Sequence, residues 1–515
     1  MTGVPDQVII GLDVGTTGVK VVAFGLGSPW RAMAIRQYPM QRPAPRQQVQ
    51  DPAVIVSAAT AALAECVASV GTARVVGISL SAAMHGLMAL DASLAPISPL
   101  VTWADGRAGE QAAELALEAV ALDLQQATGT PVHPMTPLVK LAWFARHDPS
   151  TWGAARWWVG LKDYLIVWLT GTLATELSSA SGTGLLDIST RRWSPLALAV
   201  CGVEERRLPE ILATTAVLRL DRRVAATVGL PAGTPIAVGA ADGPLANLGT
   251  GAIAAGVAAL SLGTSGAIRV AVDGPRPDRH GRLFCYALTD ALWVVGGAIS
   301  NGAEVMRWTD QAFGTGPLIS GGVASPRVNR SGGPAEQIAD SSDGLMMLPF
   351  LYPERAPLWD ADLAGAYLGV RHDHTAGHFR RAAMEGVCLQ MRFLLDRVGI
   401  CYPVASVRAT GGAFASRLWR DLMAAALDRP MTVAGDEDGT ALGAAALGLV
   451  ALGAASDLDD ALSALGGVSA ASTPITCDVE QVAAFAGIRE RLGSLLDALT
   501  RTITFEAAMP APVEP

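Results

Sequence analysis

Two short glycine-rich turns carry the groups in this sequence best suited to phosphate binding. Residues 13–18 read Asp-Val-Gly-Thr-Thr-Gly, and residues 261–266 read Ser-Leu-Gly-Thr-Ser-Gly. Glycines let backbone N–H groups approach phosphate oxygens, and threonine and serine hydroxyls supply further donors. Two such turns facing each other across a cleft can hold the phosphates of one nucleotide. We therefore predict a nucleotide site that includes Gly15, Thr16, Thr17, Lys20, Gly263, Thr264 and Ser265.

Asp13 directly precedes the first turn, at the end of an apolar run. A carboxylate at this point is suited to holding Mg²⁺, directly or through water, beside a transferring phosphate. The alternative is a plain tight hairpin in which Asp13 only caps the turn. The repetition of the turn in the second half of the chain favours the phosphate interpretation.

A third element lies at residues 410–419, where two glycines separate a strand-like run from an amphipathic segment. A strand, two glycines and a helix are typical of a place where backbone packs against an adenosine moiety. A plain strand-to-helix turn is the alternative. We expect the adenosine end of the nucleotide at Gly411, Gly412, Ala413 and Ser416.

The elements around these turns indicate α/β domains. Residues 8–24 and 257–272 each predict a β-hairpin, because two β-branched apolar runs flank a polar turn. The matched pair suggests an internal duplication with a period of about half the chain. Between the hairpins, strands at residues 74–79 and 235–240 alternate with helices at 51–69 and 109–121. A boundary is expected in the glycine- and alanine-rich residues 249–256, and a surface segment at residues 314–333.

Composition excludes several classes of protein. The chain has 515 residues, 50% hydrophobic and 17% charged, which excludes a disordered protein. Its formal net charge of −9 argues against a nonspecific nucleic-acid binder. The N-terminus lacks the basic start of a signal peptide, and residues 441–455 are too short to span a bilayer. Six cysteines without CxxC spacing indicate reduced thiols, so we expect a cytoplasmic protein that binds no membrane.

Two longer patterns carry a family resemblance. Residues 135–147 read Met-Thr-Pro-Leu-Val-Lys-Leu-Ala-Trp-Phe-Ala-Arg-His, and residues 365–385 begin Gly-Ala-Tyr-Leu-Gly-Val and end His-Phe-Arg-Arg-Ala-Ala-Met-Glu. With the two turns, they make residues 8–452 similar to the FGGY family of carbohydrate kinases. The resemblance implies an α/β fold of two actin-like (ribonuclease H-like) domains, with mixed sheets flanked by helices and an ATP cleft between them. It also implies that ATP and Mg²⁺ are used.

The domains implied by the resemblance are residues 1–250, with the sugar site and the first turn, and residues 251–505, with the second turn and the adenosine site. Residues 506–515 are expected to be a frayed tail. We expect no nucleic-acid partner and leave a homodimer open. The histidines at positions 372, 374 and 378 could suggest zinc, but they fall inside the second family pattern, where no metal site is expected.

Asp242 matches the catalytic aspartate of the family. It ends a strand-like run and stands before Gly243 and Pro244, where an arbitrary aspartate would more often be a helix N-cap. Phosphoryl transfer to an alcohol needs a carboxylate that orients the hydroxyl and accepts its proton. We assign that role to Asp242, and with Asp13 it is a candidate Mg²⁺ ligand.

A second polar cluster follows the strand at residues 74–79. Met84 and His85 come directly after it, and the string Thr-Trp-Ala-Asp-Gly-Arg follows at residues 102–107. Ligands bind at strand ends in α/β proteins, where histidine can bind hydroxyls and tryptophan can form an apolar wall. The resemblance favours a sugar site made by Met84, His85 and Trp103, and it leaves Asp105 and Arg107 more open. The alternative is ordinary core packing.

The acceptor suggested by the resemblance is gluconate. The strings around Met84, Trp103 and residues 129–138 look like the gluconate kinase branch, which implies 6-phospho-D-gluconate as product. A carboxylate on the acceptor requires a cation or a set of N–H donors. Lys162, one of only three lysines in the chain, and Arg107 are the candidates, and the sequence does not choose between them. Xylulose or another pentulose or polyol is the alternative acceptor, and an actin- or Hsp70-like ATPase without an acceptor is the alternative class.

Overall fold

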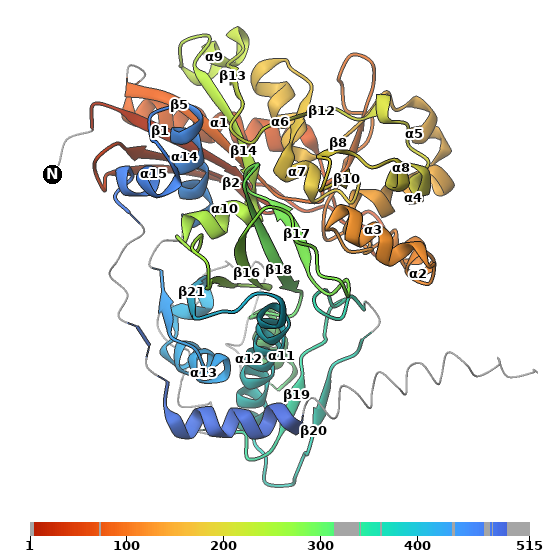
Figure 1. The fold of residues 1–515 in the computed structure, drawn as a ribbon, viewed down its shortest axis with the longest axis vertical. Coiled ribbons are helices and arrows are strands. Elements are labelled where there is room, and N and C mark those ends of the chain that lie inside the picture. Colours follow the sequence, from red (N-terminus) through yellow and green to blue (C-terminus); the bar gives the residue numbers. More distant parts are fainter. Residues whose placement is uncertain are drawn as a thin grey trace, which may run out of the picture.

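The computed structural model describes residues 5–71, 74–313, 339, 341–360, 363–434, 438–467, 474–475 and 477–491. The segment at residues 314–333 and the tail at 506–515 lie outside the described residues. The described chain builds two six-stranded sheets, one in the upper and one in the lower part of Figure 1, with helices around both. The fold is thus of the two-domain α/β type with mixed sheets.

The first sheet starts with the hairpin predicted at residues 8–24. Runs of β-branched residues form β1 and β2, which pair antiparallel, and the Gly15 N–H closes the turn on the Gly18 carbonyl (2.9 Å). Strand β5 pairs parallel to β1, and β14 pairs parallel to β5. The order is β13-β14-β5-β1-β2-β3, formed by β1 (Val8–Val14), β2 (Gly18–Gly25), β3 (Arg31–Gln37), β5 (Val75–Ala82), β13 (Val217–Arg219) and β14 (Pro235–Ala241).

The second sheet repeats this plan. Strands β15 and β16 form the second predicted hairpin, β18 pairs antiparallel to β16, and β21 and β22 add in parallel beside β15. The order is β17-β18-β16-β15-β21-β22, formed by β15 (Val257–Leu262), β16 (Gly266–Asp273), β17 (Phe284–Ala287), β18 (Leu292–Ile299), β21 (Ser406–Thr410) and β22 (Met431–Val433). Because β18-β16-β15-β21-β22 corresponds to β3-β2-β1-β5-β14, the internal duplication is confirmed.

Helices cover the sheets. On the first sheet α1 (Pro52–Val70) packs against β2 and β3, and near the second sheet α12 (Ala376–Cys401) packs against β16 and β18. By length and composition α1 could also cross a membrane. Its residues Ile55 and Leu63 are buried in the core below the sheet, so packing accounts for its apolar character. The helix predicted at 109–121 is two helices, α2 (Gly109–Ala116) and α3 (Val120–Thr128), because the chain turns between them and leaves Leu117 90% exposed.

The remaining elements lie in the stretch of sequence that connects β5 to β14 and in the surroundings of the second sheet. Most elements of the connecting stretch are on the right of Figure 1, and α9 is at the top beside β13. The stretch contains β6 (Met88–Leu90), β7 (Leu100–Val101), α4 (Pro137–His147), α5 (Pro149–Ala154), β8 (Trp157–Val159), α6 (Leu161–Thr170), β9 (Ala174–Glu176), α7 (Leu177–Ser181), β10 (Leu186–Asp187), β11 (Arg192–Trp193), α8 (Pro195–Cys201), β12 (Glu210–Leu212) and α9 (Arg222–Val228); β4 (Val49–Gln50) pairs with β7. Near the second sheet lie α11 (Glu304–Ala312), β19 (Met346–Leu348), β20 (Ala366–Leu368), η4 (Gly412–Ala415) and α13 (Arg417–Leu427).

Helix α14 (Gly439–Ala451) returns from the second half of the sequence to the first sheet. Together with α10 (Asp242–Gly249) and α15 (Leu458–Ala464), it covers the face opposite α1 and buries Ile9 and Phe24. Glycines allow the backbones to touch: a β-carbon on Gly443 would lie 2.1 Å from the Leu245 carbonyl oxygen. The position of α10, which begins with Asp242, is therefore set by direct backbone contact with α14.

Replacing Gly443 by alanine should push α10 and α14 apart, because its β-carbon would meet backbone that has no room to yield. We expect a loss of about 2–3 kcal/mol in the free energy of unfolding, the usual range for overpacking. The matched control is Gly399→Ala in the last turns of α12, where a β-carbon meets nothing within 4 Å and should gain about 0.5–1 kcal/mol. Thermal unfolding followed by circular dichroism checks this. Equal melting temperatures for the two variants would contradict the close-contact argument.

Candidate active site

The ends of three parallel strands bring the first set of predicted residues together. In the register of the first sheet, Asp13 on β1 faces Ser81 on β5, and Ser81 faces Ala240 on β14. The Ser81 hydroxyl donates to Asp13 Oδ1 (2.8 Å). Asp242 follows two residues after Ala240 as the first residue of α10, so both predicted carboxylates lie at the same edge of the sheet.

The two carboxylates influence each other. Burial raises the pKa of Asp13 to about 6; the Ser81 hydrogen bond opposes this rise, and the negative charge of Asp242 adds to it. Burial also raises the pKa of Asp242, while the positive charge of Arg269 and the Gly243 N–H (2.8 Å from Oδ1) oppose it. Two buried carboxylates whose negative charges lie close together suit a divalent cation. Mg²⁺ binds one or two carboxylates besides phosphate and water. In the described part of the chain, no three His, Cys, Asp or Glu side chains converge on a point.

Asp242 does not act as the N-cap of α10. The cap position is Ala241, whose side chain makes no capping hydrogen bond, and Asp242 is already helical. Its carboxylate has Arg269 and Lys162 as its positive neighbours, and the Met84 backbone donates to it. Its side chain therefore lies among groups from three different segments, one that donates a hydrogen bond and two that act through their positive charge.

Lys162 lies in α6 and forms a buried ion pair. Its Nζ donates to Glu176 Oε1 (3.0 Å), with both side chains 2% exposed or less. Glu176 also accepts the backbone N–H groups of Ser178 (2.5 Å) and Ser179 (2.9 Å) at the start of α7. The charge of Lys162 is thus compensated within the protein, while its field still reaches Asp242.

The loop with His85 is fastened by Lys140 of α4. Lys140 is fully buried, and its Nζ donates to the backbone carbonyls of His85 (2.6 Å), Thr102 (2.7 Å) and Met135 (2.8 Å). Burial lowers its pKa to about 7. His85 has φ of 63°, a left-handed conformation that is unfavourable for a residue with a side chain, and the Lys140 bond holds it there.

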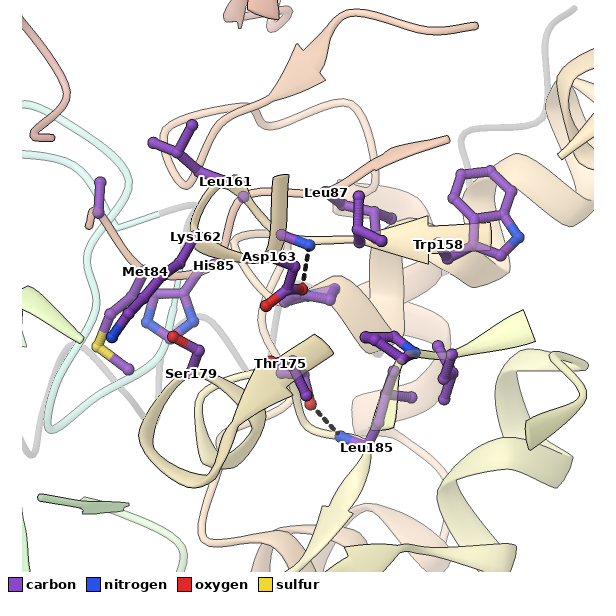
Figure 2. A pocket seen from close by; sticks show the side chains of 18 of the residues that line it. Met84, His85, Leu87, Trp158, Leu161, Lys162, Asp163, Thr175, Ser179 and Leu185 are labelled. Atoms are coloured by element: carbon purple, nitrogen blue, oxygen red, sulfur yellow. Dashed lines mark hydrogen bonds between the residues drawn. The ribbon is translucent and has the colours of Figure 1, made fainter. Parts of the chain in front are cut away.

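His85 is neutral and has one defined hydrogen bond. Burial lowers its pKa to about 3, and its Nδ1–H donates to the Gly182 carbonyl (2.7 Å), which leaves Nε2 as an acceptor. Figure 2 shows Met84, His85 and Lys162 at one end of a cavity with Trp158 at the other. The cavity has a volume of only about 40 Å³, enough for a few water molecules but not for a sugar.

Trp103 connects the first turn to the second half of the chain. Its Nε1–H donates to Thr16 Oγ1 (2.8 Å), so a predicted sugar residue contacts a predicted phosphate residue. On its ring lies the guanidinium of Arg355, with Cζ 4.9 Å from the ring centroid. The edge of the Trp103 indole thus contacts Thr16 in the first turn, and its face contacts Arg355 from the second half of the chain.

Asp105 and Arg107 brace each other. Two parallel hydrogen bonds of 2.8 and 2.9 Å join the guanidinium to the carboxylate, which also accepts the Gln48 N–H (2.7 Å). The Arg107 guanidinium further lies over the ring of Trp143, with Cζ 5.0 Å from the centroid. Both charges are therefore engaged in holding the loop that carries Trp103.

The remaining predicted nucleotide residues lie in two groups. Lys20 faces Asp13 in the hairpin register and pairs with Asp438 before α14 (3.0 Å). In the second sheet β15 and β21 run parallel, so Gly263, Thr264 and Ser265 stand at the same edge as Gly411, Gly412, Ala413 and Ser416. Gly411 has φ of 114°, and a β-carbon there would lie 2.3 Å from the Leu262 carbonyl oxygen, so only glycine fits.

Three residues near these groups were missed in the sequence: Arg269 on β16, Tyr286 on β17 and Arg355. The available signal for Arg269 was a single charge inside an otherwise apolar strand. No local feature of the sequence distinguishes Arg355 or Tyr286, because the groups that surround them come from residues far away in the sequence.

Comparisons with known proteins agree with this arrangement over nearly the whole chain. The N-terminal domain model of the FGGY family of carbohydrate kinases matches residues 8–249, and the C-terminal domain model matches residues 258–452. The gluconokinase of Bacillus subtilis is 34% identical over 95% of this chain and 96% of its own. The xylulose kinase of Escherichia coli is 29% identical over 86% of this chain and 90% of its own. The crystal structure of gluconate kinase from Lactobacillus acidophilus has a TM-score of 0.86 at 28% identity, covering 96% of this chain and 98% of that one.

Replacing Asp13 by asparagine should stabilise the protein in a pH-dependent way when no metal is added. Since the folded pKa of about 6 lies above the ordinary value of 3.8, the folded state holds the proton more tightly than the unfolded state does. The free energy of unfolding of the unsubstituted protein therefore falls as pH rises from about 4 to about 6. The gain from Asp13→Asn should be small at pH 4 and reach up to about 3 kcal/mol above pH 6.

The control for this prediction is Asp187→Asn. Hydrogen bonds from Ser189 and Thr190 lower the pKa of Asp187, so its carboxylate stabilises the fold above its ordinary pKa, and its replacement should destabilise at pH 7. Urea unfolding at pH 4.5 and 7.5 in the presence of a chelator measures both. A gain for Asp13→Asn that does not change with pH would refute the burial argument.

Proposed function

The chain belongs to the FGGY family of carbohydrate kinases, and from this premise we propose that it phosphorylates D-gluconate to 6-phospho-D-gluconate with ATP. The observation that carries the catalytic part is the meeting of Asp13 and Asp242 at one edge of the first sheet. The choice of gluconate is supported by the higher identity to the gluconokinase (34%) than to the xylulose kinase (29%).

Asp242 acts as the base in this proposal. Its carboxylate takes the proton of the acceptor hydroxyl while the hydroxyl oxygen forms a bond to the γ-phosphorus of ATP. The bond from the γ-phosphorus to the bridging oxygen breaks on the opposite side, and its electron pair leaves with ADP. Burial raises the pKa of Asp242, which makes it a better proton acceptor, and the nearby positive charges of Arg269 and Lys162 oppose that rise.

Asp13 is the proposed holder of Mg²⁺, directly or through water, with Asp242 beside it. When bound, the ion would neutralise charge on the phosphate oxygens. The backbone of the two turns and the Thr16, Thr17, Thr264 and Ser265 hydroxyls would bind the phosphates. Gly411, Gly412, Ala413 and Ser416 would border the adenosine.

The acceptor would lie between Asp242 and the loop of His85. Neutral His85 keeps Nε2 free to accept a hydrogen bond from a sugar hydroxyl, because Nδ1–H is committed to Gly182. Trp103 provides an apolar face, and its bond to Thr16 couples the acceptor side to the phosphate turn. Lys162 contributes through its field on Asp242 rather than as an unpaired charge.

The acceptor proposal is tested with purified protein, ATP and Mg²⁺ by measuring ADP release with D-gluconate, D-xylulose, D-ribulose and glycerol. We expect kcat/KM for gluconate to exceed that of each other acceptor by at least about tenfold. A preference for xylulose would replace gluconate by a pentulose and keep the kinase. ATP turnover that does not respond to any acceptor would indicate an ATPase and reject the proposal.

Replacing Asp242 by asparagine keeps the shape of the side chain and removes its ability to take a proton. We expect kcat for the preferred acceptor to fall by about 10² or more, with the Kd for ATP analogues changed less than about threefold. Asp273→Asn at the exposed end of β16 is the control and should leave kcat unchanged. If Asp242→Asn retains near-native kcat, Asp242 is not the base.

A further inference from the structure

Two arginines from the second half of the chain, near the residues around His85 and Trp103, have no bonded carboxylate among the described residues. Arg269 lies on β16 against the start of α10, and its Nε and Nη2 are each 3.5 Å from where a β-carbon on Gly243 would be. Within the described part of the chain, Arg355 bonds only to neutral groups, the Ser300 hydroxyl (3.2 Å) and the Ile299 carbonyl (2.8 Å), and it stacks on Trp103. Among the described residues, neither guanidinium forms an ion pair within 4 Å.

Burial of these two arginines makes their charged forms energetically unfavourable. Burial lowers the pKa of Arg269, and it lowers that of Arg355 to about 10, so Arg355 stays positive at neutral pH. The nearby Glu354 does not bond the Arg355 guanidinium, since its carboxylate accepts from Asn301 Nδ2 (2.6 Å) and from backbone N–H groups. Buried cations without bonded anions are unfavourable unless a ligand supplies the negative charge.

Two buried polar groups nearby each have an atom that makes no hydrogen bond within the described part of the chain. Among the described residues, the Tyr286 hydroxyl and His133 Nε2 have no hydrogen-bond partner, although these side chains are 2% and 7% exposed. The Tyr286 ring lies 5.6 Å from the ring of His85, and its hydroxyl is in the field of both arginines. His133 accepts the Met135 N–H at Nδ1 (3.2 Å), so in its neutral form Nε2 carries the proton.

Four donors from β16, β17 and two loops thus lie in one another's electrostatic surroundings, and among the described residues none of them donates to a carboxylate. The sequence suggested Lys162 and Arg107 for the carboxylate, but Glu176 and Asp105 already compensate those charges. We propose that Arg269 and Arg355, with the Tyr286 hydroxyl and His133 Nε2–H as neighbouring donors, form an anion subsite that receives the carboxylate of the sugar acid. This inference rests on the proposed function, because it names how the same site selects an acid over a neutral sugar.

The same cations could instead bind a phosphate group of the nucleotide. Position favours the acceptor for Arg355, since it stacks on Trp103 and lies in the electrostatic surroundings of His85 and His133. The test therefore has one arm for each source of negative charge.

The experiment compares Arg355→Met and Arg269→Met with the unsubstituted enzyme, using D-gluconate and D-glucitol, a neutral polyol of the same length. We expect the KM for gluconate to rise about ten- to hundredfold, the range for loss of a charge-assisted hydrogen bond. For Arg355→Met, the KM for ATP should change less than about twofold, and turnover of D-glucitol should not fall. Arg408→Met is the matched control, because Arg408 also lies on a strand of the second sheet and bonds only a backbone carbonyl (Thr250, 3.0 Å).

A second variant keeps the test independent of folding. Tyr286→Phe removes only a hydroxyl without a partner, so the melting temperature should be equal or higher, while binding of gluconate alone, followed by calorimetry, should weaken several-fold.

The results distinguish a failure of the proposed gluconate kinase activity from a failure of the anion subsite. If the unsubstituted enzyme does not phosphorylate gluconate, the proposed function fails. If it does, but both Arg→Met variants keep the preference for gluconate over D-glucitol, the subsite is overturned. A higher KM for ATP together with an equal loss of kcat for every acceptor in Arg355→Met would also overturn it, because that arginine would then bind phosphate.

Discussion

The buried ammonium of Lys140 is the constraint on which the acceptor side depends. A charge with no access to water needs several hydrogen-bond acceptors, and three backbone carbonyls supply them. These carbonyls belong to His85, Thr102 and Met135, which lie on separate segments, so one side chain fixes their relative positions. His85 is held in a left-handed conformation, and the residue after Thr102 is Trp103. The geometry of the acceptor loop thus follows from the need to satisfy one charge.

Most other charges in this region are arranged in compensated pairs. Glu176 neutralises Lys162, Asp105 neutralises Arg107, and Asp438 pairs with Lys20. Among the described residues, Asp13, Asp242, Arg269 and Arg355 form no ion pair within 4 Å. Arg269 lies beside Asp242 at the edge of the first sheet. Arg355 lies on Trp103, where it joins the two halves of the chain.

Local patterns were enough to predict both hairpins and the duplication, because hydrophobic period and turn glycines depend on neighbours in the sequence. The edge position of Asp13 and Asp242 also followed, since residues after parallel strands share an edge. The partners of the charged residues could not be predicted in this way. The partner of Lys162 is 14 residues away on another element, and Arg355 meets Trp103 across 252 residues. Burial and pairing of a side chain are decided by the tertiary fold, which no window of sequence contains.

The return of α14 to the first sheet has a consequence for synthesis on the ribosome. Residues 5–250 can form the strands of the first sheet, but the face with Ile9, Val22 and Phe24 is covered by residues 441–465. While the chain is being made, this apolar face stays open until almost the whole protein has emerged, and contacts so distant in sequence form slowly. The first half is therefore unable to complete its core alone. The nascent chain exposes an aggregation-prone apolar surface for most of its translation. The same glycine contact that positions Asp242 makes α14, from the late part of the sequence, a requirement for the sheet that is synthesised first.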